Sequence, residues 1–291
     1  MSVPEGLDLV TTPNGLRAVV RGPWRGEFHD YLFQQPIAEI ELNQGKGWRG
    51  ADVSFLSSFP RLRTLELLDL SIRDIAGVHA LHELRELVLL TYSGTNIRFG
   101  EFPNLEYCAL EWGKRRAESL FECKGLRHLS IGHYPGIDLT ELGRLGRLES
   151  LWITTSPIKR QAGIERLHVL RELHLRGLRK LESLHGIEDL ASLEELVVHT
   201  CRQVRSIAPV SGLVHLRKLH LNNDGDIESL NPLMALDGLE EVGFYESTNI
   251  LDGDLSPLTR LPRLRLLAFQ NRRHYSHRCE EFLAYREARH D

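Results

Sequence analysis

Three histidines have nearly identical surroundings in the second half of the chain. His174, His199 and His220 occur in the segments ELHLRG, ELVVHT and KLHLNN, each beside a pair of aliphatic residues, and Glu172 and Glu195 lie close by in the sequence. Neutral imidazole nitrogens are common zinc ligands, and carboxylates can orient them from the second coordination shell. A histidine and a glutamate can also act as a general acid and base on a bound substrate. Either chemistry requires these side chains to meet, which depends on the elements that carry them.

The aliphatic pairs beside the histidines belong to a repeat that runs through most of the chain. Eleven pairs of aliphatic or similar residues, with the two members two positions apart, recur at spacings of 21 to 25 residues. These pairs are Ile40/Leu42, Leu65/Leu67, Leu87/Leu89, Cys108/Leu110, Leu129/Ile131, Leu151/Ile153, Leu173/Leu175, Leu196/Val198, Leu219/Leu221, Val242/Phe244 and Leu267/Phe269. Alternate residues of a strand point to the same side, so each pair predicts a short strand with both members in the core.

The segments between the predicted strands have a period of three. From Leu175 to Leu196, leucine or isoleucine recurs at every third position, and the segment after Leu221 nearly repeats this pattern. A spacing of three predicts a turn and a 3₁₀ or short α-helical segment with one edge buried. Strands that are one full repeat apart must run parallel. The units are therefore predicted to stack into an α/β solenoid with one parallel sheet on its inner face.

This pattern resembles the leucine-rich-repeat proteins, in particular the class with units of about 22 residues that occurs in bacterial internalins. The resemblance covers roughly residues 37–270. It implies a horseshoe with about eleven parallel strands on the concave face and 3₁₀ or short helical segments on the convex face. The asparagine ladder of that family, five residues after the first aliphatic of each strand, is poorly kept here, and Cys201 and Asp224 are the closest matches.

A solenoid exposes apolar surface at both ends and needs a cap at each. Residues 1–36 contain LDLVTTPNGLRAVV, which predicts two short strands around the turn sequence PNG, followed by the aromatic stretch EFHDYLFQQ. Residues 271–291 predict a helical cap that places Phe282, and Leu283 or Tyr285, against the last unit. We therefore expect an N-terminal cap, the repeats and a C-terminal cap, and no separate catalytic domain.

Charged residues alternate in sign along the repeats. The residue two positions before the first aliphatic of nine successive strands is Arg85, Glu106, Arg127, Glu149, Arg171, Glu194, Arg217, Glu240 and Arg265. Equivalent residues of adjacent strands lie about 5 Å apart. One exposed pair contributes only roughly 0–1 kcal/mol, but a slipped unit would lose two pairs and misplace its aliphatics. We expect a ladder that fixes strand register rather than a binding stripe, because alternating charges cancel each other's field.

The outward side chains of the predicted strands line the concave face, which is acidic. Eight glutamates face two basic residues there, Arg176 and Lys218. Five of these glutamates, Glu39, Glu41, Glu66, Glu86 and Glu111, belong to the first four units. An acidic concave face repels phosphate backbones and favours a basic protein or peptide. We therefore expect a protein or peptide partner, basic in character, and no nucleic acid.

From the fifth unit onward the concave face carries aromatic, histidine and polar residues. The residues expected to contact a partner are Trp152, His174, Arg176, His199, His220, Asn222 and Tyr245, together with Tyr107, Glu41 and Glu66. Tryptophan, tyrosine and arginine are enriched at interface hot spots, and an open solenoid surface suits a protein better than a small substrate. We interpret the chain as a non-catalytic protein- or peptide-binding scaffold with an adaptor, inhibitor or immunity-type role.

The alternative interpretation is an enzyme that uses the histidine cluster. His174 and His220 should lie two strands apart, about 9 to 10 Å between Cα atoms, with His199 on the strand between them. Glu172 and Glu195 would then complete a site that works with or without a metal. We assign no metal ligands and no cofactor. The sequence contains no G-x-x-x-x-G-K, G-x-S-x-G or H-E-x-x-H motif.

The composition is that of a soluble globular protein. The 291 residues are 42% hydrophobic and 26% charged, with a net charge of −4. The N-terminal sequence lacks the basic and apolar regions of a secretory signal, and no apolar run approaches the ~18 residues that a membrane span needs. The four cysteines are far apart and form no C-x-x-C pair. We expect a cytoplasmic monomer with reduced thiols and no membrane partner.

Overall fold

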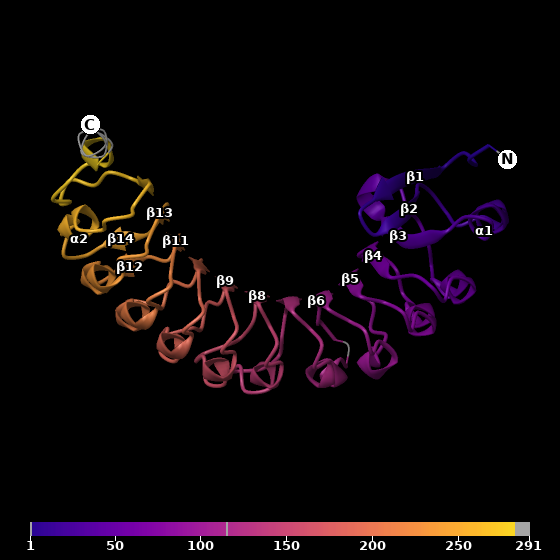
Figure 1. Ribbon diagram of the computed structural model, residues 1–291, viewed down its shortest axis with the longest axis horizontal. Helices are drawn as coiled ribbons and strands as arrows, with labels where there is room; N and C mark the ends of the chain where they lie inside the picture. The colour runs from indigo at the N-terminus through magenta and orange to yellow at the C-terminus, as the bar shows by residue number, and fades with distance from the viewer. Residues whose placement is uncertain (1, 115, 283–291) are drawn as a thin grey trace. The chain divides into compact units, whose positions relative to one another are not determined.

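The structure is a computed structural model that describes residues 2–114 and 116–282. The chain divides into two compact units, Met1–Gly132 and His133–Asp291. Within each unit, short strands line one side and 3₁₀ turns line the opposite side (Figure 1). We call the outward surface of the strands the concave face and the turn side the convex face. Leu283 and Tyr285, which the sequence predicts in the C-terminal cap, lie outside the described residues.

The first unit begins with an antiparallel hairpin and continues as parallel repeats. Strands β1 (Leu7–Thr12) and β2 (Gly15–Val20) flank the predicted PNG turn, and helix α1 (Gly26–Leu32) follows them. The repeat strands are β3 (Ile37–Asn43), β4 (Thr64–Leu68), β5 (Glu86–Leu90), β6 (Tyr107–Glu111) and β7 (His128–Gly132). The 3₁₀ turns are η1 (Gln44–Lys46), η2 (Ser54–Ser58), η3 (Ala76–Ala80), η4 (Phe99–Glu101) and η5 (Glu118–Glu122).

The second unit has the same construction. Its repeat strands are β8 (Ser150–Thr154), β9 (Glu172–Arg176), β10 (Glu195–His199), β11 (Lys218–Asn222), β13 (Glu241–Tyr245) and β15 (Leu266–Phe269). The convex elements are η6 (Leu142–Arg144), η7 (Ile164–Arg166), η8 (Ile187–Asp189), η9 (Ala208–Gly212), η10 (Asn231–Ala235) and helix α2 (Ser256–Thr259). Strands β12 (Asp226–Ile227) and β14 (Asn249–Ile250) form a separate two-stranded parallel sheet. Residues 279–282, at the end of the described chain, are helical.

The strand predictions are confirmed in both number and register. Each of the eleven aliphatic pairs lies on one of the strands β3 to β11, β13 and β15, and the strands of each unit follow chain order. Leu173, Leu196 and Leu219 are Cα partners on successive parallel strands. Successive pairs are Cα partners throughout, so no register shift interrupts the stack from β3 to β7 or from β8 to β15 in the described pairings. The fold class predicted from the sequence, a leucine-rich-repeat solenoid, is confirmed.

The core of each repeat consists of these aliphatics and of the residues at every third position. In the segment after β9, the side chains of Leu178, Leu181, Leu184, Ile187, Leu190 and Leu193 are all 0% exposed. Only Ile187–Asp189 of this segment forms a 3₁₀ turn, with three residues per turn, and the turns on either side of it continue the same buried edge. The burial of about six such side chains per repeat, at roughly 1.5–3 kcal/mol each, is the main stabilising contribution.

A sharp turn after five repeat strands of the second unit, β8 to β11 and β13, uses the left-handed backbone region. Thr155, Thr200, Asn223 and Glu246 have φ between 47° and 58°, and Gly177 at the equivalent position has φ 66°. Glycine and asparagine adopt this conformation readily, whereas a β-branched residue such as Thr155 is strained there. The repeated stack holds the turn in this shape even where the residue does not favour it.

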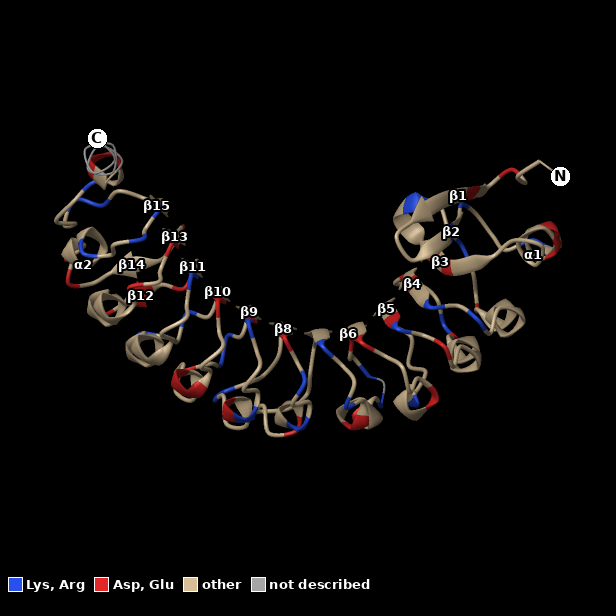
Figure 2. Ribbon diagram, in the orientation of Figure 1, with Lys and Arg blue, Asp and Glu red and all other residues tan. Residues whose placement is uncertain are grey.

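Several of the alternating charges pair across adjacent repeats, as the sequence predicts. Nη1 of Arg171 lies 3.0 Å from Oε1 of Glu194, and Nη2 of Arg217 lies 2.7 Å from Oε1 of Glu240. Figure 2 shows acidic and basic residues alternating along the repeats of the second unit. The backbone amide of Glu194 also donates a hydrogen bond to the carbonyl oxygen of Arg171, 2.8 Å away. The ladder therefore ties adjacent repeats together through both side chains and backbone.

The turn after β11 buries an aspartate at the position of the asparagine ladder. Asp224 is 0% exposed, and its Oδ1 accepts a hydrogen bond from the backbone amide of Cys201, 2.7 Å away. Its own amide donates to the hydroxyl of Thr248, but its Oδ2 has no partner among the described residues. Burial raises the pKa of Asp224 to about 7, and the hydrogen bond from Cys201 opposes that rise. The aspartate thus links two turns at an electrostatic cost.

Candidate interaction surface

An ordered aromatic and cationic stack lies on the concave face of the second unit. Trp152 on β8 and His174 on β9 are Cα partners, and their rings stack with centroids 4.2 Å apart and planes 10° apart. The guanidinium carbon of Arg176 lies 5.6 Å from the centroid of the tryptophan ring, within the range of a cation–π contact. Trp152 remains 38% exposed. The indole is therefore held in position while a large part of its surface is open to a partner.

Two of the three histidines pair with glutamates on the following strands. Nε2 of His174 lies 2.9 Å from Oε1 of Glu195, and Nε2 of His220 lies 2.7 Å from Oε1 of Glu241. The second pair repeats the first two strands further along the sheet, from β11 to β13. The ring of His220 has room because Gly243 lacks a side chain. A Cβ added at Gly243 would lie only 3.1 Å from Cδ2 of His220. Each imidazole is thus fixed by a partner within the chain.

The environment of His174 determines its protonation. The residue is 5% exposed, and burial lowers the pKa of its imidazole, although the charge and the hydrogen bond of Glu195 oppose this shift. The imidazole is therefore neutral at pH 7, its Nε2–H donates to the carboxylate of Glu195, and Nδ1 is the unprotonated nitrogen. This Nδ1 is buried and has no partner among the described residues.

The third histidine lies in a different environment. His199 lines an open pocket of about 670 Å³ together with Asn222, Tyr245, Glu246 and Gln270. Tyr245 is 42% exposed at the rim of this pocket. In residues 2–114 and 116–282, no group of three or more His, Cys, Asp or Glu side chains is arranged to hold a metal ion. The structure thus does not bring the three histidines together at one metal-binding point.

The remaining acidic residues near the histidines also have partners. Glu172 accepts a hydrogen bond from the hydroxyl of Ser150, 2.9 Å away. Glu195 contacts Nζ of Lys218, 3.5 Å away, in addition to His174. Both glutamates are therefore held by neighbours within the chain, and the exposed large side chains of this face include the aromatic residues Trp152 and Tyr245.

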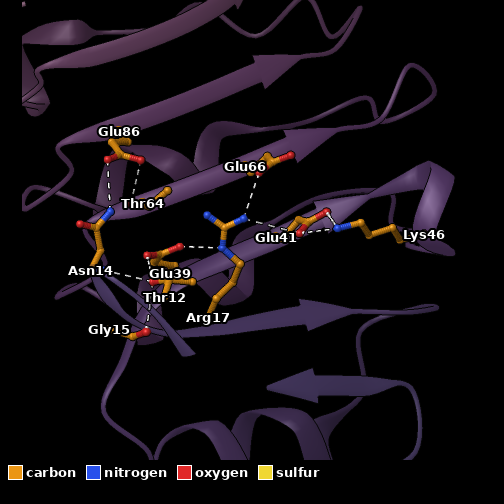
Figure 3. Close-up of polar contacts among 10 residues, drawn as sticks. All are labelled: Thr12, Asn14, Gly15, Arg17, Glu39, Glu41, Lys46, Thr64, Glu66 and Glu86. Atoms are coloured by element: carbon orange, nitrogen blue, oxygen red, sulfur yellow. Dashed lines mark hydrogen bonds and ion pairs between the residues drawn. The ribbon is translucent and has the colours of Figure 1, made fainter. Parts of the chain in front are cut away.

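The acidic end of the first unit differs from the sequence-based expectation in one respect. Glu39 and Glu41 are 0% and 2% exposed, so they do not lie open on the concave face. Arg17 of β2 reaches across them: its Nε lies 2.6 Å from Glu39, and its Nη1 lies 3.7 Å from Glu41 and 3.4 Å from Glu66 (Figure 3). Glu41, which we expected to contact a partner, is instead covered and ion-paired within the chain.

Further contacts from the N-terminal hairpin and η1 complete this network. Nζ of Lys46 lies 2.7 Å from Glu41, and the hydroxyl of Thr12 donates to Glu39 (Figure 3). Asn14, in the hairpin turn, donates to Glu86 on β5 at 3.3 Å. The sequence repeat could not reveal Arg17 because the hairpin lies outside the repeat. The sequence features that could have indicated this role for Arg17 are the predicted PNG turn and the position of the arginine two residues after it.

Tyr107 is another residue of the first unit that the sequence suggests as a partner contact. Tyr107 on β6 is 37% exposed, and its ring centroid lies 6.2 Å from that of His128 on β7.

Within the described part of the chain, no helix combines the length and apolar character that a membrane crossing requires.

Comparison with known proteins identifies relatives in structure but not in sequence. No protein-family model matches the chain, and no curated protein matches it. Among solved structures, the internalin inlF from Listeria monocytogenes is similar over 88% of this chain and 87% of its own, with 20% identity and a TM-score of 0.55.

Two further solved structures show the same similarity. A leucine-rich-repeat protein from Leptospira interrogans covers 88% of this chain and 77% of its own length, with 16% identity and a TM-score of 0.54. The functional domain of InlJ from Listeria monocytogenes covers 87% and 68%, with 14% identity and a TM-score of 0.51. Together with the strand register and the repeat spacing, these likenesses show that the chain has the leucine-rich-repeat solenoid fold with internalin-like repeats.

Proposed function

We propose that the chain is a non-catalytic scaffold that binds a protein or peptide on the concave face of its second unit. The observation that carries this proposal is the state of Trp152, which is 38% exposed although its ring is stacked on His174 and contacted by Arg176. A partner that covers this indole gains its buried area without first ordering it. Preordered aromatic and arginine side chains of this kind dominate the energetics of protein interfaces.

The pocket beside Tyr245 supports the same proposal. Its rim offers a second aromatic, and its lining offers the polar groups of His199, Asn222 and Gln270. An open surface with scattered aromatics and polar groups suits a large partner, whereas small substrates are usually enclosed. A role as adaptor, inhibitor or immunity-type protein would use this surface in the same way, by covering a complementary surface on another protein.

We also propose a cellular location and an oligomeric state for the chain. All four cysteines are free thiols, and Cys108 and Cys201 are buried. Burial raises the pKa of Cys201 to about 12, so its thiol is unreactive at neutral pH. Free thiols are typical of the reducing cytoplasm, and we propose this location for a chain that works as a monomer.

The test uses substitutions that remove the aromatic anchors without touching the core. A partner captured with the full chain is purified, and its Kd is measured by isothermal titration calorimetry for the wild type, Trp152→Ala and Tyr245→Ala. Each loss of an anchor should weaken binding by about 30-fold, the equivalent of roughly 2 kcal/mol. Val214→Ala, at a 60% exposed convex residue, is the matched control. Unchanged affinity in both aromatic variants would contradict the proposal.

A catalytic function is the second candidate, and one observation favours it. His174 presents an unprotonated Nδ1 without a partner among the described residues, while its Nε2 is held by Glu195, which is the arrangement of an oriented base. The nitrogen is buried, however, so a substrate could reach it only after the stack with Trp152 opened. Elemental analysis of the purified, tag-free chain and of the variant with His174, His199 and His220 changed to Ala tests the metal-dependent form. Stoichiometric metal that the triple variant loses would favour an enzyme.

A further inference from the structure

The concave face of the first unit carries an apolar patch at the ends of β4 and β5. Leu68 and Leu90 are Cα partners and are both part-exposed. Two residues further along the chain, Leu70 is 55% exposed and Tyr92 is 64% exposed. We call these four residues the β4–β5 patch. Leu70 and Tyr92 lie just beyond the ends of the two strands. Exposed apolar side chains at the ends of adjacent strands are typical of a surface that a partner covers.

Uncompensated negative charge lies directly beside this patch. Glu66 precedes Leu68 by two positions on β4, and Glu86 precedes Leu90 by four positions on β5. In the network of Figure 3, the four carboxylates of Glu39, Glu41, Glu66 and Glu86 face only two cations, Arg17 and Lys46. Arg17 contacts Glu39, Glu41 and Glu66, and Lys46 contacts Glu41, so two cations leave a surplus of two negative charges among the four carboxylates. Glu66 and Glu86 are the two carboxylates that are part-exposed.

The local electrostatics favour a further cation at this position. Burial raises the pKa of Glu66, and repulsion from Glu41 raises it further, while Arg17 and Lys46 oppose the rise. The side chain of Glu66 is still 27% exposed, so another positive group can reach it. Arg17 shows how an arginine fits, because it already lies along this face with its guanidinium between Glu39, Glu41 and Glu66.

We propose that the β4–β5 patch, with Glu66 and Glu86, binds a partner segment in which an arginine or lysine lies next to aliphatic or aromatic side chains. The basic group pairs with the two glutamates, and the apolar groups cover Leu68, Leu90 and Tyr92. If the partner segment is extended, its residues i and i+2 point to the same side and lie about 6.5–7 Å apart. Glu66 and Leu68 have the same spacing along β4, so a basic residue and an apolar residue at i and i+2 of the segment can face them. The inference goes beyond the proposed function, because it adds a binding surface on the first unit to the one proposed on the second unit.

The test selects peptides on the intact protein. Random 12-residue peptides displayed on phage are selected against the immobilised full chain, and recovered peptides are synthesised and measured by calorimetry. The expected motif has a basic residue one or two positions from an aliphatic or aromatic residue. The affinity of these peptides for the double variant Glu66→Gln/Glu86→Gln should be about tenfold weaker than for the wild type. Their affinity for the wild type should also fall as the salt concentration is raised. Tyr92→Ala, at an exposed side chain that does not endanger folding, should also weaken binding.

Other outcomes overturn the inference or separate it from the proposed function. Selected peptides that are acidic or uncharged, or that bind the Glu66→Gln/Glu86→Gln variant unchanged, contradict the inference. Peptides whose binding depends on Trp152 and Tyr245 but not on Glu66 or Tyr92 contradict it and leave the proposed function standing. A dimer seen by light scattering that Tyr92→Ala dissociates would also overturn it, because a second copy would then occupy the patch. Val214→Ala is the control for all measurements.

Discussion

Replacement of Asp224 by asparagine should stabilise the chain at neutral and alkaline pH. The carboxyl is fully buried, accepts one hydrogen bond from Cys201 and leaves Oδ2 without a partner among the described residues. The asparagine side chain would keep an oxygen for the amide of Cys201 and remove the charge. The Cys201 thiol, whose pKa burial raises to about 12, stays neutral over the same range and adds no competing charge.

The magnitude follows from the pKa. The pKa of Asp224 is raised from the usual 3.8 to about 7, so the folded state disfavours the ionised form by up to about 4 kcal/mol relative to the unfolded state. Because the folded pKa lies above the unfolded one, the contribution of Asp224 to stability is most favourable below pH 4 and falls as the pH rises from about 4 to about 7. Above pH 7 the loss is complete and stays constant.

Urea unfolding at pH 5 and pH 8 measures this effect. The stability of Asp224→Asn relative to the wild type should increase by about 3 kcal/mol between the two pH values, because most of the pKa difference lies in this interval. Asp237→Asn, at an exposed aspartate of the same unit, should show no such change. A difference between variant and wild type that is the same at both pH values would refute the reasoning, as would a variant that is less stable at pH 8.

Three further experiments test the fold. Arg17→Ala should lower the free energy of unfolding by about 3 kcal/mol, because it leaves buried carboxylates without their main cation. Urea unfolding measures this loss, and a loss of less than about 1 kcal/mol would contradict the role of Arg17. Arg171→Glu should lower the unfolding midpoint, and Glu194→Arg in the same chain should restore part of it, whereas additive losses would reject the ladder. Thr155→Gly should stabilise by about 0.5–1 kcal/mol, since glycine relieves the left-handed strain; no gain would mean that the strain is negligible.

The repeat made the fold predictable because one pattern recurs eleven times. A strand with two aliphatics such as Leu173 and Leu175 has only one side that can face the core, and a slip by one residue would expose both. Stacking then forces parallel pairing, and the alternating charges of residues such as Arg171 and Glu194 reinforce the register. These inferences need only sequence periodicity, which is why they agree with the structure.

The details of the candidate surface depend on contacts that periodicity does not encode. Three histidines at similar positions suggested convergence, but His174 and His220 turn toward glutamates on the next strands and His199 lines a pocket. The rotation of an imidazole depends on its neighbours, for example on the space above Gly243. Likewise, Glu41 belongs to the repeat, whereas Arg17, one of the two cations that contact it, comes from the hairpin outside the repeat.

Hydroxyl-radical footprinting of the complex with the captured partner tests the claim that this partner covers the concave face of the second unit. Trp152 and Tyr245 are both reactive and exposed, and Met234 on the convex side is 45% exposed and serves as an internal control. We predict that oxidation of Trp152 and Tyr245 slows in the complex while that of Met234 does not change. Protection of Met234 with Trp152 and Tyr245 still oxidised at the free rate would contradict the claim.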